Sequence, residues 1–259
     1  MTADDLLEAA RHHDWEMPGR ACAAPPSFLG VAERELPSLD DVAQHIVALA
    51  LVRQDAPGAG RALLRIAATG PTAAAAVAAQ GLATVADPPP SADVIATIPR
   101  VADPLVRTFL YLSAGRLGSF ADVPALRDVA ALEEDSDVLA TAQVAAVRLG
   151  AVEERDLFVQ QLHETTPAGA KTAAQYLMYV NDPGLAVGLL GWLNDGSAVM
   201  RMCTDPKRRS ARMCDLAVWT ARSLGVPLGR PVEALDIYPA DVIDDARRAL
   251  TTLASRAAR

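Results

Sequence analysis

The feature that most constrains the fold is a short break that recurs at a nearly fixed spacing. The break is Leu117-Gly118, then Leu149-Gly150, then Val180-Asn181. Its members begin at positions 117, 149 and 180, so they lie 32 and then 31 residues apart. Each break follows one apolar run and precedes another. Self-similarity at this period is typical of chains built from stacked supersecondary units.

The apolar runs on either side of the breaks have the period of an α-helix. The runs before them are LVRTFLYLSAGRLG, VLATAQVAAVRLG and AKTAAQYLMYVND, and the runs after them are VPALRDVAAL, ERDLFVQQL and GLAVGLLGWL. In the second run Val138, Ala142, Ala145 and Leu149 follow at i, i+4, i+7 and i+11, which places them on one helix face. Each break is therefore predicted to join two helices.

The second member of each helix pair carries its own register. Leu126, Phe158 and Leu189 repeat with the same spacings of 32 and 31 residues. We expect these three side chains to occupy equivalent buried positions in successive pairs. The same register predicts a loss of about 3–5 kcal/mol when a buried Phe158 is truncated to alanine.

The residues at the ends of these runs fit helix termini. Gly or Asn at a break suits the left-handed conformation that often ends a helix. Asp103-Pro104 and Asp182-Pro183 each combine an N-cap acid with proline at the first helical position.

A fourth break, Leu224-Gly225, begins 44 residues after Val180. It ends a helical stripe formed by Cys214, Ala217, Ala221 and Leu224. The extra length falls in GSAVMRMCTDPKRR, which we interpret as a loop inserted between units.

The first part of the chain shows no period. We expect a helix over 4–13, an irregular proline-containing stretch up to 36, and a helix that starts at Ser38, with Asp40 and Asp41 at its positive end. Further helices are predicted over 62–68 and 72–85. Three prolines in 87–91 predict a linker there, since they cannot continue a helix. The predicted regions are 1–91, which is helical and left open as degenerate repeats, and 92–259.

Residues 103–225 resemble short bacterial HEAT repeats, in which an Ala-rich helix, a Leu-Gly turn and a Leu-rich helix alternate. The segment ARMCDLAVWTARSLG is similar to a last repeat, and IYPADVIDDARRALTTL to a C-terminal capping helix. The resemblance implies an all-α fold, an α-solenoid of stacked antiparallel helix pairs. Proteins of this kind serve as scaffolds, inhibitors, lyase subunits and DNA-repair enzymes.

Charge and composition limit the kinds of partner and the cellular compartment that we expect. The chain has a formal net charge of −8 and a pI near 5.0, which argues against a nucleic-acid partner, because phosphate binding needs a basic face. The N-terminus is acidic and polar, and no stretch reads as a membrane span. An odd number of cysteines without a CxxC motif predicts reduced thiols in a cytoplasm. The abundance of Ala, Pro and Arg is typical of GC-rich bacterial genomes.

The inserted loop and one tryptophan are the candidate partner-binding residues. Arg201, Arg208, Arg209 and Arg212 fall in the loop together with Lys207 and one acid, Asp205, for a net +4. Arginine binds carboxylates bidentately, so the loop could contact an acidic partner; a solvated loop is the alternative. Trp192 falls in the second helix of its pair, beside Gly188 and Gly191, where it could anchor a partner or pack in the core.

Other polar clusters favour structural roles. The adjacent His12 and His13 point to different sides of a helix and lack metal-ligand spacing. In the acidic run 133–137, Ser136 or Asp137 is placed to cap the next helix, and the run could also form an edge of an acidic binding surface. No catalytic, metal or cofactor site is predicted, because the sequence contains no GxSxG, Walker A or EF-hand pattern. The segment GAGRALL lacks the third glycine and the preceding strand of a dinucleotide fingerprint.

We therefore expect a protein–protein interaction module, a scaffold or a specific inhibitor of the immunity-protein kind, that binds a protein partner in a helical-repeat groove. The alternative is a HEAT-like enzyme such as a DNA glycosylase or a lyase subunit. A glycosylase needs a basic groove lined with aromatic side chains, whereas this chain is 4% aromatic and acidic.

Overall fold

A computed structural model describes residues 2–21, 25, 27–54, 56–201, 209–232 and 234–257. Most of these residues are helical, as the composition predicts. The chain divides into two compact units, unit 1 over 1–151 and unit 2 over 152–259. The division falls after Ala151, whereas the sequence places its boundary at the prolines near position 90. Each unit is described by itself.

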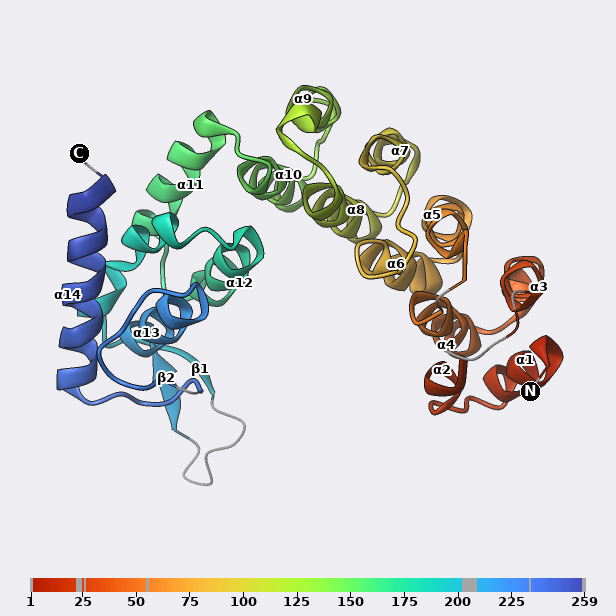
Figure 1. The fold of residues 1–259 in the computed structure, drawn as a ribbon, viewed down its shortest axis with the longest axis horizontal. Coiled ribbons are helices and arrows are strands. Elements are labelled where there is room, and N and C mark those ends of the chain that lie inside the picture. The colour runs from red at the N-terminus through yellow and green to blue at the C-terminus, as the bar shows by residue number, and fades with distance from the viewer. Residues whose placement is uncertain are drawn as a thin grey trace. The chain divides into compact units, whose positions relative to one another are not determined.

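Unit 1 consists of helices in two rows (Figure 1). The inner row is α4 (Asp41–Val52), α6 (Thr72–Gly81), α8 (Pro104–Leu117) and α10 (Ser136–Arg148). The outer row is α3 (Ser27–Glu35), α5 (Ala59–Thr69), α7 (Ser91–Thr97) and α9 (Val123–Ala130). Successive members of each row contact one another. The short helices α1 (Ala3–Arg11) and α2 (Met17–Arg20) pack against α4.

Small side chains allow the inner row to pack closely. A Cβ on Gly81 of α6 would lie 2.2 Å from the Val52 side chain of α4, so only glycine permits this approach. Between α6 and α8, the buried Ser113 hydroxyl donates to the Ala79 carbonyl at 2.6 Å. Alanines fill much of the surrounding core. The Ala-rich composition therefore serves close helix contact in unit 1.

Aspartates cap the inner helices that follow an acidic loop. Asp40 accepts a hydrogen bond from the Ala43 amide at 2.8 Å, and Asp103 accepts one from the Leu105 amide at 2.9 Å. Asp135 accepts one from the Asp137 amide at 2.9 Å. The caps are thus one or two residues away from the predicted Ser38 and Ser136 or Asp137. Asp103-Pro104 begins α8 as predicted.

Two segments of unit 1 differ from the sequence prediction. The stretch expected to be irregular contains α2 and α3, and α3 buries Phe28 and Ala32. The predicted linker 87–91 packs inside the unit, because a Cβ on Gly60 of α5 would lie 2.3 Å from the Asp87 carbonyl and 2.8 Å from the Pro89 ring. The prolines therefore lie directly before α7 and do not separate two compact units.

Unit 2 is less regular. It contains α11 (Val152–Glu164), α12 (Ala170–Val180), α13 (Met213–Ser223) and α14 (Ala240–Ala257), with the 3-10 segments η5 (Pro183–Leu189) and η6 (Trp192–Asn194). The run GLAVGLLGWL thus forms two 3-10 segments where an α-helix was predicted. Its Gly188 lies against α11, where an added Cβ would be 2.9 Å from the Leu162 side chain. The final helix α14 packs against α13 and η5.

The inserted segment forms the two strands of a hairpin. β1 (Ala198–Arg201) and β2 (Ser210–Arg212) pair antiparallel, with Arg201 opposite Ser210 and Ala198 opposite Arg212. The sequence predicts a loop here, whereas its prediction of little β-structure for the chain as a whole agrees with the described residues. Strand pairing across a long connection leaves no local periodicity, which explains the difference.

The repeated breaks share a conformation only in part. Gly150, Asn181 and Gly225 have positive φ, as predicted for helix ends, whereas Gly118 has an extended backbone with φ −85°. Around Gly118 the space is closed, since a Cβ would lie 2.9 Å from the Ala114 carbonyl. The burial of the register residues is confirmed for Leu126, Phe158 and Leu189.

Candidate functional site: the acidic edge of unit 1

Trp192 belongs to the core of unit 2. Its side chain is 2% exposed, and its indole Nε1 donates to the Leu162 carbonyl at 2.8 Å. A partner could not reach this ring without opening the unit. The position agrees with the core-packing alternative for Trp192, because the side chain has almost no exposed surface with which to anchor a partner.

Among the hairpin arginines that the structure describes, one is bonded to a buried carboxylate and two are exposed. Arg212 caps α13 and forms two hydrogen bonds to Asp215, at 2.9 and 2.8 Å, and a third to the Tyr238 carbonyl. Since the Asp215 side chain is fully buried, Arg212 neutralises a core carboxylate. Arg201 is exposed at the end of β1, and Arg209 is exposed just before β2. Arg208 lies outside the described residues.

Seven of the 19 acidic residues of unit 1 lie where the inner helices α4, α8 and α10 begin. Each inner helix is followed by an outer helix that returns the chain, so the inner helices run in one direction and their starts share an edge. We call this edge, with the loops that lead into α4, α8 and α10, the acidic edge. It consists of Asp40, Asp41, Asp103, Glu133, Glu134, Asp135 and Asp137.

Hydrogen bonds to backbone and to Arg107 occupy part of this edge. Asp40, Asp103 and Asp135 are the helix caps, and the Ala43 amide, together with His13, lowers the pKa of Asp40. Asp41, Glu134 and Asp137 are exposed, and their carboxylates have no partner among the described residues. These three charges are therefore available to a ligand.

Exposed apolar side chains lie between the charges. Val42 is 37% exposed beside Asp41, Leu105 is 51% exposed in the first turn of α8, and Leu132 is 73% exposed beside Glu133. Trp15 is also exposed, and its ring meets His45, one turn after Val42, edge to face at 5.7 Å. Apolar groups surrounded by charges are characteristic of protein interfaces.

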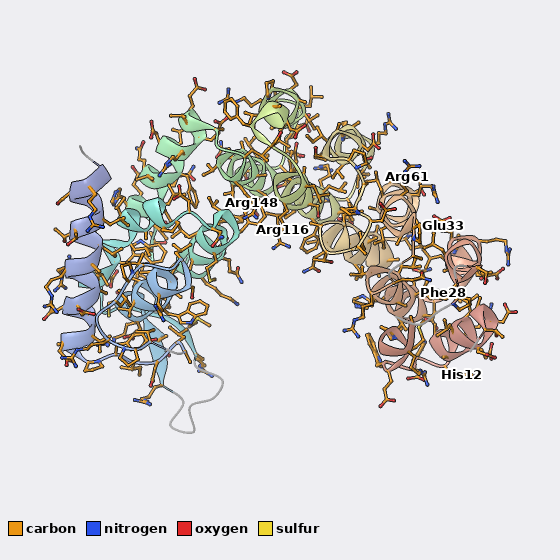
Figure 2. The ribbon with its side chains drawn as sticks, in the orientation of Figure 1. His12, Phe28, Glu33, Arg61, Arg116 and Arg148 are labelled. Carbon is orange, nitrogen blue, oxygen red and sulfur yellow. The ribbon has the colours of Figure 1, made fainter. Side chains whose placement is uncertain are left out.

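Basic side chains lie where three of the inner helices end. Arg53 follows α4, while Arg116 and Arg148 lie in the last turns of α8 and α10. Figure 2 shows Arg116 and Arg148 on the side of these helices that is turned away from the outer row. Acids at helix starts and bases at helix ends both stabilise the helix dipole, so this polarity has a structural cause as well.

A hollow of about 270 Å³ opens on the acidic edge between α7, α8 and α9. Arg107 of α8 forms two parallel bonds to Glu133, with Nε–Oε2 at 2.8 Å and Nη2–Oε1 at 2.7 Å. The Glu133 and Arg107 side chains are 5% and 17% exposed. The same guanidinium donates to the Val101 and Ala102 carbonyls, just before α8. Through these bonds and those to Glu133, Arg107 joins the loop before α10 to the loop before α8.

Tyr111 lines the floor of the hollow. Its ring is fully buried, and its hydroxyl has no hydrogen-bond partner among the described residues. Burial, followed by the nearby Glu133 charge, raises the pKa of Tyr111 to about 12, so the phenol is neutral at physiological pH. The bond from Arg107 lowers the pKa of Glu133 below its usual value. The hollow therefore lies over a buried neutral phenol and beside a compensated ion pair.

Sequence reasoning missed Arg107 and Tyr111. Glu133 was noted as part of an acidic run, but nothing in the sequence joins it to Arg107, 26 residues earlier. A visible signal was the single base, Arg107, in the first turns of a helix that starts at Asp103.

The remaining polar candidates are structural or exposed. His12 contacts Glu8 at 3.1 Å, and His13 contacts Asp40 at 2.8 Å. Among the described residues, no group of three or more His, Cys, Asp or Glu is placed to hold a metal ion. Cys214 is a free, buried thiol whose pKa is raised by burial, whereas Cys22 and Cys203 lie outside the described residues. Over the described part of the chain, every helix is too short or too polar to cross a bilayer.

No protein-family model matches the chain, and no curated protein or solved structure shows significant similarity to it. The class of protein is therefore defined by the fold alone: a mostly helical chain of two units, one of them a two-row helical array.

Proposed function

We propose that the chain is a protein-binding module and that unit 1 binds a basic protein partner along its acidic edge. In this proposal unit 1 is an α-solenoid of HEAT-like helix pairs, a scaffold or a specific inhibitor. The observation that carries it is the presence, on that edge, of both exposed apolar side chains and unpaired carboxylates. Leu105 and Leu132 supply apolar contact area, and Asp41, Glu134 and Asp137 supply charge.

The charge of the two units supports a basic partner. Unit 1 contains 11 Lys and Arg residues against 19 Asp and Glu, a net −8, whereas unit 2 contains 13 of each, a net 0. All of the net charge of the chain thus belongs to unit 1. Complementary charge mainly raises the association rate and fixes the orientation of partners, while buried apolar groups supply affinity.

The arrangement of the helices supports a wide contact surface. In a row of parallel helices, each helix contributes its first turn to the same edge, so the edge lengthens with every pair. The hollow beside Tyr111 lies on this edge and has the volume to receive one side chain of the partner. Specific interfaces commonly place an anchor side chain in such a pocket.

The test compares two charge-matched variants. Glu134→Lys with Asp137→Lys reverses two unpaired charges of the edge, and Asp4→Lys with Asp156→Lys reverses two exposed charges elsewhere. Both are used as bait in host lysate, with quantitative mass spectrometry. We expect basic proteins that bind the wild type and the control but not the edge variant, with binding that weakens as salt increases.

The association rate of the purified candidate partner is then measured with the wild type and with both variants. An on-rate reduced about tenfold or more by the edge variant, and unchanged by the control, supports the proposal. Equal on-rates for the wild type and the edge variant at low salt would contradict it.

A further inference from the structure

Three hollows follow one another along the outer row of unit 1, one in each gap between neighbouring outer helices. The first is lined by the ends of α3 and α5 and measures about 220 Å³. The second lies between α5 and α7 and measures about 400 Å³. The third is the hollow between α7 and α9 on the acidic edge. Arginine lines all three hollows: Arg65 lines both the first and the second, and Arg107 of α8 lines the third.

In the two flanking hollows, a glutamate neutralises the arginine. Arg65 of α5 binds Glu33 of α3 through Nε at 3.0 Å and Nη2 at 2.7 Å. Arg107 binds Glu133 in the third hollow with nearly the same two-pronged geometry. Carboxylate is therefore the group that these gaps accept beside a guanidinium.

The middle hollow lacks such a carboxylate. Arg61 of α5 and Arg100, just after α7, line it, and both side chains are exposed. Neither guanidinium has a hydrogen bond or an ion pair to any residue that the structure describes. Asp93 also lines the hollow, but no ion pair joins it to either arginine. Figure 2 shows Arg61 on α5 and Glu33 on the neighbouring α3.

The walls between these charges are apolar. Leu64 and Ala68 of α5 and Ala96 of α7 line the hollow. The Thr97 hydroxyl donates a hydrogen bond to the Asp93 carbonyl within α7. Glu33 compensates Arg65, so Arg61, Arg100 and Asp93 leave a net side-chain charge of +1 around the hollow. This site attracts anions locally, whereas the net charge of −8 on unit 1 repels them from the rest of its surface.

We infer that the hollow between α5 and α7 binds a carboxylate-bearing segment of a protein partner, with Arg61 and Arg100 each pairing with an acidic side chain and an aliphatic side chain resting on Leu64. The site meets the acidic edge at Arg100, which lies in the loop that leads into α8, but its other lining residues belong to α5 and α7, and it binds the opposite charge. A peptide of glutamate and leucine has the required chemistry, because arginine binds carboxylate bidentately and the apolar floor accepts leucine.

The experiment uses the full chain and a fluorescein-labelled peptide, Glu-Leu-Glu-Glu-Leu-Glu, with its glutamine counterpart as the uncharged control. Binding is followed by fluorescence anisotropy at low salt. Arg61→Gln with Arg100→Gln is the test variant. Arg34→Gln with Arg53→Gln removes the same charge from exposed positions of unit 1, and Arg201→Gln with Arg209→Gln tests the hairpin.

We expect the test variant to bind the glutamate peptide at least about tenfold more weakly than the wild type, while both other variants stay within about twofold. Arginine Nε–H resonances of Arg61 and Arg100 should shift on titration with the peptide. Circular dichroism and the melting temperature should be unchanged in the test variant, since both side chains are exposed and unpaired.

Three results would overturn the inference. One is equal affinity of the test variant and the wild type. Another is loss of affinity in the hairpin variant instead. The third is a preference of the hollow for a hexamer of single-stranded DNA over the peptide, since this would assign the hollow to phosphate.

Discussion

Units 1 and 2 differ in how well a sequence repeat predicts regular packing. Unit 1 has its helices in two clear rows, although its first 91 residues show no sequence period. Unit 2 contains two of the four breaks, Val180-Asn181 and Leu224-Gly225, yet its helices are interrupted by 3-10 segments and a hairpin. Regular packing therefore does not require a visible repeat, and a visible break does not ensure regular packing.

The difference has a physical cause in the side chains at the helix contacts. In unit 1, buried alanines and Gly81 let neighbouring helices approach closely, and many different Ala-rich sequences satisfy this requirement. In unit 2, larger side chains are in contact, and the Trp192 indole donates a hydrogen bond to the Leu162 carbonyl of α11. Such contacts depend on individual residues, so they bend the chain away from the ideal helix pair.

The largest expected effect tests whether the sequence register reaches into unit 2. Phe158→Ala should lower the free energy of unfolding by about 3–5 kcal/mol, because the ring is 4% exposed in the core. Its neighbour Leu157 is 51% exposed, so Leu157→Ala should cost no more than about 0.5 kcal/mol. Urea unfolding of both variants measures the contrast, and similar losses would show that the face of α11 is misassigned.

The second prediction concerns the Arg107–Glu133 pair of unit 1. Glu133→Gln should cost about 2–3 kcal/mol at neutral pH, less than for a fully buried pair, because Arg107 keeps its two carbonyl bonds and some contact with water. Chemical denaturation monitored by circular dichroism measures this loss. Glu134→Gln removes the neighbouring exposed charge and should have almost no effect.

The same pair predicts a pH dependence. Arg107 lowers the folded pKa of Glu133 below its ordinary value of 4.5, so the pair stabilises unit 1 above that pH and loses this contribution as the pH falls through the folded pKa. The difference in unfolding free energy between wild type and Glu133→Gln should therefore shrink in acid. A constant difference from neutral pH down to acid unfolding would show that the carboxylate charge is not responsible.

Much of the secondary structure could be predicted from the sequence, but the site could not. The stripe from Val138 to Leu149 and the Asp103-Pro104 start are local signals, and both agree with the structure. Pairing between Arg107 and Glu133 depends on how three helices pack, which no local spacing encodes. Trp192 illustrates the converse: its neighbours in sequence permit either a surface or a core position, and only the contact with Leu162 decides.

The smallest expected effect separates a glycine that unit 2 needs from one that it does not. A Cβ on Gly188 would lie 2.9 and 3.0 Å from the Leu162 Cδ1 and Cβ atoms, whereas a Cβ on Gly191 would meet nothing within 4 Å. Gly188→Ala should therefore cost about 1–2 kcal/mol, because either Leu162 or η5 must move. Gly191→Ala should be neutral or slightly stabilising, since alanine restricts the unfolded chain and has a negative φ available here.

This pair of substitutions tests why GLAVGLLGWL forms two 3-10 segments. If close contact with α11 determines the path of the chain, only Gly188→Ala should be destabilising, and it should also perturb Trp192 fluorescence, because the indole bonds to the Leu162 carbonyl. If the glycines act only by weakening an α-helix, both substitutions should stabilise unit 2 and raise its helix content. Thermal unfolding and far-UV circular dichroism of the two variants distinguish these outcomes.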